Sequence, residues 1–80
     1  MSKVADLAEK AMAELASGAQ LFDLKVNYIL EVRPDEALTA SADIVHSGRR
    51  TVVTWCRIVS GPRLVATASA TFAVTRVEEH

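Results

Sequence analysis

The stretch VHSGRRTVV, residues 45–53, places several polar side chains around one turn of the chain. Arg49 and Arg50 follow Gly48, and His46 lies two residues before that glycine. A guanidinium group can donate two parallel hydrogen bonds to a phosphate, so the arginine pair could hold an anionic ligand. The alternative is an exposed hairpin tip whose charges keep the edge of a sheet soluble. The residues alone favour this second interpretation.

The remaining reactive side chains give weaker patterns. Cys56 is the single cysteine, which excludes an intrachain disulfide and a metal site built from a cysteine cluster. A nucleophilic pair of Cys56 with His46 would need a cross-strand geometry that the pattern does not support. We therefore expect Cys56 to be a small buried hydrophobe. We expect no metal site and no cofactor, and the chain has no glycine-rich phosphate loop.

Two different spacings of apolar residues predict the elements that carry these side chains. Residues 2–17 have apolar side chains at three- and four-residue intervals, which predicts an amphipathic helix capped by Ser2 and ended by Gly18. The predicted buried stripe of this helix is Val4, Leu7, Ala8, Ala11 and Leu15. After the helix the spacing changes to two, which predicts strands over about 21–32, 38–46, 50–59 and 63–76.

Short glycine-containing turns join the last three predicted strands, so these strands should be antiparallel neighbours. The predicted fold class is α+β, with one N-terminal helix packed on an antiparallel four-stranded sheet in a single domain, residues 1–80. Ala66, Ala68 and Ala70 share one strand face and are small enough to let the alanine-rich helix lie close. Asn27 and Tyr28 fall on opposite faces, and we expect Tyr28 in the core with its hydroxyl at the rim.

The composition of the chain limits which kinds of partner we expect it to bind. Eighty residues bury only about 60–65% of the extended surface, and half of the residues are apolar, so we expect a homo-oligomer. A net charge of −1 makes nucleic acid a poor partner. No apolar run approaches the roughly 18 residues that span a membrane, and the start lacks the pattern of a signal peptide. We therefore expect a soluble cytoplasmic protein with no membrane partner.

Four segments together resemble a known family. They are VADLAEKAMAELAS, VNYILEV, LTASADIVHSGRRTVV and RLVATASATFAV, in this order and with sensible spacing over nearly the whole chain. In this combination they are similar to hotdog-fold thioesterases, and most similar to the phenylacetyl-CoA and 4-hydroxybenzoyl-CoA thioesterase group. The resemblance implies hydrolysis of an acyl-CoA thioester by a dimer or tetramer, with the coenzyme A moiety as part of the substrate.

The resemblance also implies roles for particular residues. Asp6 matches the catalytic carboxylate of the family's central helix, which acts as nucleophile or as the base that activates water. Glu9 is the alternative, because one subgroup carries its acid after Leu-Ala and this chain has Leu7-Ala8-Glu9. Without the resemblance, both belong to the solvated face of the helix. The residues implied in substrate or coenzyme A binding are His46, Gly48, Arg49, Arg50 and, in an acyl pocket, Asn27.

The chain departs from the family pattern at its start. Members usually carry a strand and a His-Gly-Gly loop before the central helix, whereas here Met1 falls within the start of that helix. In the family a backbone N–H at the helix N-terminus polarises the thioester carbonyl. Three interpretations stay open: an active thioesterase, a non-catalytic module that binds an acyl-CoA-like ligand or assembles into oligomers, and a truncated form of a longer parent.

Overall fold

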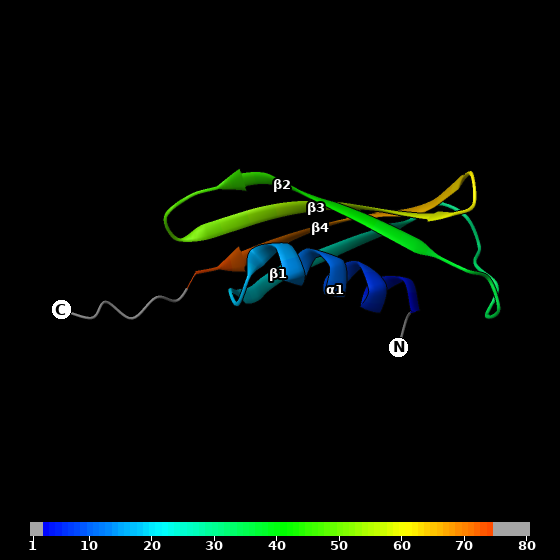
Figure 1. Cartoon of the computed structure of the whole chain (residues 1–80), viewed down its shortest axis with the longest axis horizontal. Coiled ribbons are helices and arrows are strands. Elements are labelled where there is room, and N and C mark those ends of the chain that lie inside the picture. Colours follow the sequence, from blue (N-terminus) through cyan, green and yellow to red (C-terminus); the bar gives the residue numbers. More distant parts are fainter. Residues whose placement is uncertain (1–2, 75–80) are drawn as a thin grey trace.

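The computed structural model describes residues 3–74, which form one helix and one antiparallel sheet (Figure 1). The elements are α1 (Lys3–Ala16), β1 (Gln20–Tyr28), β2 (Thr39–Ser47), β3 (Thr51–Ser60) and β4 (Arg63–Ala73). The strands are ordered β1-β4-β3-β2, and α1 packs on one face of the sheet. This confirms the predicted α+β class. Ser2, the predicted cap, and residues 75–76 of the predicted last strand lie outside the described residues.

Helix α1 buries one row of side chains against the sheet. Val4, Ala8, Met12 and Ala16 recur every fourth residue and are the buried residues of the helix. The predicted stripe was wrong at its end, because Leu15 is 38% exposed and Met12 is fully buried in its place. Ser17 and Gly18 adopt left-handed backbone angles, φ 53° and 90°, which end the helix. No helix in the described part of the chain is long and apolar enough to cross a membrane.

The sheet face under α1 is the core of the domain. Cys56 and Ile58 of β3 and Ala66 and Ala68 of β4 are all fully buried there. This confirms the predicted burial of Cys56 and the predicted common face of Ala66 and Ala68. Cys56 and Ala68 are direct cross-strand partners, and Ala8 and Met12 of the helix belong to the same apolar cluster. Small alanine side chains on both elements therefore bring helix and sheet close together.

Each of the three strand pairings contains a register shift, and at two of these shifts a large apolar side chain is exposed. In β1 the register shifts between Leu21 and Asp23, and Phe22 at this bulge is 77% exposed. In β2 the shift lies between Ile44 and His46, and Val45 there is 65% exposed. The alternation in the sequence cannot register such an extra residue, because it assumes an unbroken pleat.

The predicted strand over 21–32 ends at Tyr28. Ile29 and Leu30 both donate their amides to the Val65 carbonyl, at 2.8 and 3.1 Å, so the regular alternation of ladder bonds stops there. The chain then forms a connection without regular structure, residues 29–38, which we call the β1–β2 loop.

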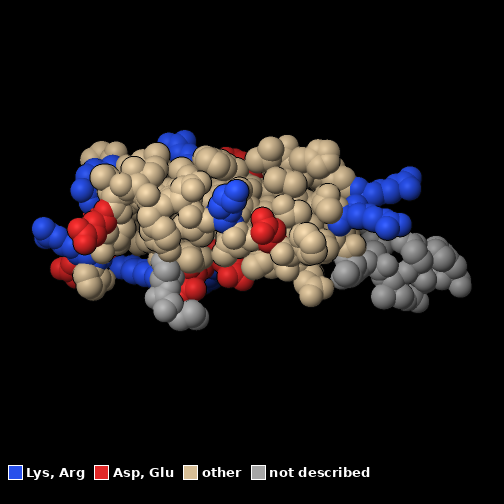
Figure 2. All heavy atoms as spheres, turned by 180° about the vertical axis from the view of Figure 1, so that it is seen from behind, with Lys and Arg blue, Asp and Glu red and all other residues tan. Residues whose placement is uncertain are grey.

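The molecule is elongated, with a longest extent of 51 Å, and its two ends differ. One end carries the turn of the β2–β3 hairpin. The other carries the start of α1, the β1–β2 loop and the β3–β4 turn (Figure 1). Basic side chains project from the first end, and acidic and basic side chains mix at the second (Figure 2).

Candidate functional site

Asp6 lies in an open hollow between the helix and the β1–β2 loop. The hollow has a volume of about 740 Å³ and is lined by Lys3, Asp6, Leu7 and Lys10 of α1 and by Glu36, Ala37 and Leu38 of the loop. Asp6 stands in the first turn of α1, where a negative charge is favoured by the aligned peptide dipoles. An exposed carboxylate facing a hollow with apolar and cationic walls can act as a base or a nucleophile on a bound ligand.

Glu9, the alternative acid, lies almost one turn further along α1. Its side chain is half-buried, and it is not among the residues that line the hollow around Asp6. The structure therefore places one of the two predicted carboxylates in a space that a ligand could enter. The sequence alone could not separate them, since both occupy the polar side of the helix.

A more apolar cleft opens at the same end of the molecule. It has a volume of about 490 Å³ between the start of α1, the end of β1 and the β1–β2 loop. Its lining is Lys3, Val4, Tyr28, Ile29, Leu30, Glu31, Val32, Arg33 and Pro34. Tyr28, expected in the core, is 57% exposed and forms part of this wall. Lys3 lines both this cleft and the hollow of Asp6, so the two spaces are neighbours.

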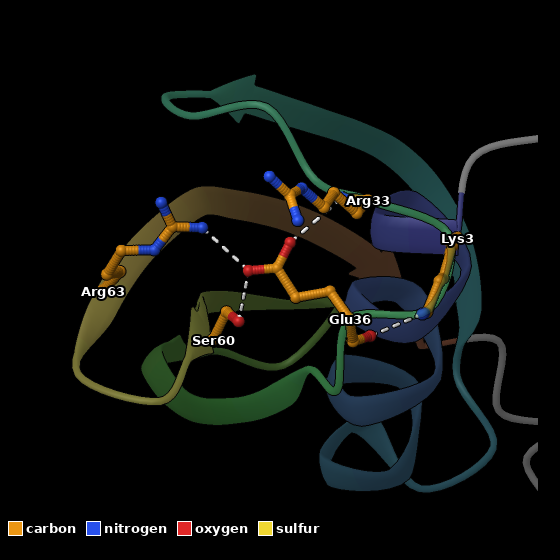
Figure 3. Close-up of polar contacts among 5 residues, drawn as sticks. All are labelled: Lys3, Arg33, Glu36, Ser60 and Arg63. Carbon is orange, nitrogen blue, oxygen red and sulfur yellow. Dashed lines mark hydrogen bonds and ion pairs between the residues drawn. The ribbon is translucent and has the colours of Figure 1, made fainter.

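Glu36 fixes the β1–β2 loop to three other elements, β3, β4 and α1. Its Oε2 accepts hydrogen bonds from the Ser60 hydroxyl at 2.5 Å and from Arg63 Nη2 at 2.7 Å, and its Oε1 accepts one from the Arg33 amide at 3.0 Å. Lys3 Nζ donates to the Glu36 carbonyl at 2.7 Å (Figure 3). The pKa of Glu36 falls from 4.5 to about 2, chiefly because the Ser60 hydroxyl and the Arg33 amide bind its carboxylate.

No pattern in the sequence points to Glu36. Its side-chain partners Ser60 and Arg63 lie 24 and 27 positions further along the chain. No local spacing connects residues so far apart. The one available indication is that an acid follows the Pro34-Asp35 turn and that Arg63 stands in another turn.

The predicted anion-binding residues lie at the opposite end of the sheet. His46, Gly48, Arg49 and Arg50 belong to the β2–β3 hairpin, and all four are exposed. A β-carbon added to Gly48 would lie 3.3 Å from His46 Nε2, so the imidazole ring stands against this glycine. Strand β3 separates this turn from Arg63 by ten residues, about 33 Å of extended chain. Within one chain, the structure does not bring the arginines to Asp6.

Two further candidates also lie away from the hollow of Asp6. Asn27 pairs with Thr67. The neighbouring pair, partly buried Val26 and fully buried Ala68, faces the core, so Asn27 lies on the opposite sheet face, away from α1. Cys56 is fully buried beneath the helix, and burial raises the pKa of its thiol, which disfavours the nucleophilic thiolate. His46 is paired with Val53 and is remote from Cys56 along the sheet, so the two form no nucleophilic pair. Among residues 3–74 no group of three acidic, His or Cys side chains could hold a metal.

Comparison with solved structures supports the fold. A variant of the phenylacetic acid degradation protein PaaI from Thermus thermophilus matches 88% of this chain and 64% of its own, with 25% identity and a TM-score of 0.81. A Bacillus halodurans protein solved with CoA matches 90% of this chain and 52% of its own, with 27% identity and a TM-score of 0.75. Mouse thioesterase superfamily member 2 shares the fold at 17% identity, with a TM-score of 0.77, over 90% of this chain and 62% of its own.

The chain thus spans less than two thirds of the length of these proteins. No curated protein sequence matches it significantly. The family model of the thioesterase superfamily matches residues 3–67, which include all of α1, β1, β2 and β3. Three observations indicate the same fold: the helix on an antiparallel sheet, the hotdog-fold neighbours and this family match. The chain belongs to the thioesterase superfamily.

Proposed function

We propose that this protein hydrolyses an acyl-CoA thioester, with Asp6 as the catalytic carboxylate. The observation that carries the proposal is the position of Asp6, in the first turn of α1 and facing the hollow beside the β1–β2 loop. The family match and the CoA-containing structural neighbour support the choice of substrate class. Glu9 does not line this hollow, which favours Asp6 over it.

The proposed reaction is the addition of water to the thioester carbonyl. Asp6 either takes a proton from the attacking water or attacks the carbonyl carbon itself, in which case water then cleaves the resulting anhydride. The carbon–sulfur bond breaks, the carboxylic acid forms, and a proton passes to the departing CoA thiolate. Backbone N–H groups at the start of α1 would stabilise the developing oxyanion. The neighbouring apolar cleft, with Tyr28, Ile29 and Leu30 in its wall, has room for an acyl group.

In this proposal the arginines of the hairpin tip contact a ligand that is bound by a second copy of the chain. Because Arg49 and Arg50 lie at the far end of the sheet from Asp6, one chain cannot place both on the same short ligand. A dimer in which the hairpin of one protomer approaches the helix start of its partner would bring the guanidinium groups to the CoA phosphates. His46 and Gly48 would shape that hairpin. Asn27 does not line the apolar cleft, so in this proposal it would lie at the interface between the two protomers.

The test is hydrolysis of short aromatic and aliphatic acyl-CoAs, followed by detection of the free CoA thiol. We expect the wild-type protein to release thiol well above the uncatalysed rate and the Asp6→Ala variant to lose this activity. Equal rates for the two proteins would contradict the catalytic role of Asp6.

A second candidate function is a non-catalytic module that binds an acyl-CoA-like ligand or assembles with other copies. The observation that favours it is that β1 and β2 are the outer strands of the sheet formed by residues 3–74, and each pairs along one side only. This candidate predicts an oligomer, or CoA binding without turnover. Sedimentation of a monomer at micromolar concentration, together with no CoA binding by calorimetry, would contradict it.

A further inference from the structure

The β1–β2 loop forms one wall of the hollow that contains Asp6. Glu36, Ala37 and Leu38 stand on the loop side of this hollow, and Asp6 stands on the helix side. Residues 29–38 contain no helix or strand, and the internal backbone bond from the Glu36 amide to the Arg33 carbonyl, 3.1 Å, closes only the turn. The width of the hollow therefore depends on what holds the loop to the rest of the domain.

Side-chain bonds from three other elements hold this loop, and they reach it at Pro34 and Glu36. The carboxylate binds Ser60 at the end of β3 and Arg63 at the start of β4. On the other side, Lys3 of the helix donates to the carbonyl oxygens of Pro34 and Glu36, at 3.1 and 2.7 Å. Figure 3 shows Glu36 between the β3–β4 turn and the first turn of α1.

The burial of the partners indicates which of these bonds matter most. The Glu36 side chain is 17% exposed, whereas that of Arg63 is 51% exposed. An exposed ion pair contributes little because water and salt screen it. A short bond from a neutral hydroxyl to a carboxylate that is largely covered is less exposed to screening, so Ser60 should hold the loop more firmly than Arg63 does.

We infer that Glu36 is a positioning residue, which fastens the β1–β2 loop to the β3–β4 turn and so sets the wall of the hollow in which Asp6 works. This inference rests on the proposed thioesterase function of Asp6. Without the Glu36 carboxylate, the loop would lose its side-chain bonds to the β3–β4 turn and would keep those from the exposed Lys3 side chain. The loop would then occupy more open positions, and a bound thioester would be held less closely against Asp6.

Glu36→Gln tests the inference because it keeps the shape of the side chain but replaces one carboxylate oxygen with an NH₂ group. That group cannot accept the bonds from Ser60 and Arg63, while the amide oxygen can still accept the bond from the Arg33 amide. Asp35→Asn is the matched control, since it removes a charge from the adjacent exposed position of the same loop. Ser60→Ala removes one donor and leaves the carboxylate, so it should act in the same direction with smaller effect.

Hydrogen exchange of the peptide that covers residues 29–38 reports how readily the hydrogen-bonded amides of the loop open to solvent. We expect exchange to become at least about tenfold faster in Glu36→Gln than in Asp35→Asn. In acyl-CoA hydrolysis we expect the KM of Glu36→Gln to rise several-fold and kcat to fall less, because the catalytic carboxylate is intact. A purely structural role would lower the amount of folded protein without moving KM.

The outcomes separate the two proposals. Unchanged loop exchange in Glu36→Gln would overturn the fastening role, whatever the activity. Faster exchange with unchanged KM and kcat would overturn the positioning role and leave the thioesterase proposal standing. Absence of turnover in the wild-type protein would instead overturn the thioesterase proposal, and with it the role of Glu36 in catalysis.

Discussion

The Ser60 hydroxyl donates a 2.5 Å hydrogen bond to the carboxylate of Glu36, across 24 positions of the chain. This bond joins the end of β3 to a loop that has no regular structure of its own. It is also the largest cause of the low pKa of Glu36, followed by the Arg33 amide, while desolvation acts in the opposite direction and Arg63 adds smaller contributions.

The low pKa of Glu36 predicts a pH-dependent contribution to stability. The folded pKa is about 2 and the ordinary value is 4.5, so the ionised group stabilises the folded state above pH 4.5. This contribution is lost as the pH falls from 4.5 to about 2. We expect the difference in unfolding free energy between wild type and Glu36→Gln, measured with urea, to be largest at pH 7 and to shrink at pH 3.

The groups that contact Glu36 determine whether another titration could cause the pH dependence of the stability difference. They are the Arg63 guanidinium, the Ser60 hydroxyl, the Arg33 amide and, at its backbone carbonyl, the Lys3 ammonium. None of these partners is itself a carboxylate. A difference between the two proteins that stays constant or grows on acidification would therefore contradict the assignment.

Met12 and Leu15 give opposite predictions for two similar side chains on one helix. Met12 is fully buried against the sheet, so Met12→Ala should lower the free energy of unfolding by about 2–5 kcal/mol. Leu15 is 38% exposed, so Leu15→Ala should cost about 1 kcal/mol or less. Thermal or urea unfolding of the two variants measures the difference, and equal losses would contradict the observed helix face.

The residues that are buried in the structure show how much of the fold could be predicted from the sequence. The expected burial of Cys56 is confirmed, because period-two alternation places alternate side chains of a strand on the face under α1. On the helix, the apolar spacing predicted a stripe that ends at Leu15, whereas packing on the sheet buries the neighbouring row that contains Met12. The bulge at Phe22 and the bond between Ser60 and Glu36 could not be predicted, since both depend on contacts between distant segments.

Two turn glycines should respond differently to the addition of a methyl group. Gly61 has φ 61°, in the left-handed region, so Gly61→Ala should destabilise the protein by about 1–2 kcal/mol. Gly48 lies outside that region, and the nearest atom to an added β-carbon is the movable ring of His46 at 3.3 Å. We therefore expect Gly48→Ala to change stability by less than about 0.5 kcal/mol. A larger loss for Gly48→Ala would show that the His46 ring cannot move.

The hairpin tip carries a prediction about ligand affinity. If Arg49 and Arg50 of one protomer meet the CoA phosphates held by its partner, the double variant Arg49→Ala/Arg50→Ala should raise the Kd for CoA by about tenfold. The loss should diminish at high salt. Arg57→Ala is the control, because Arg57 is exposed on the sheet face away from the helix. Equal Kd values for the double variant and the control would contradict this role and indicate that the arginines only keep the hairpin edge soluble.

The comparison of Asp6→Asn with Glu9→Gln tests the account most directly. Both changes remove one carboxylate charge from α1 and keep nearly the same shape, but only Asp6 lines the hollow beside the loop. With an acyl-CoA that the wild-type protein hydrolyses, we expect Asp6→Asn to lower kcat by at least about 100-fold and Glu9→Gln to change it by less than about threefold. A similar kcat for Asp6→Asn and wild type, or a large loss in Glu9→Gln alone, would contradict the assignment of Asp6 as the catalytic residue.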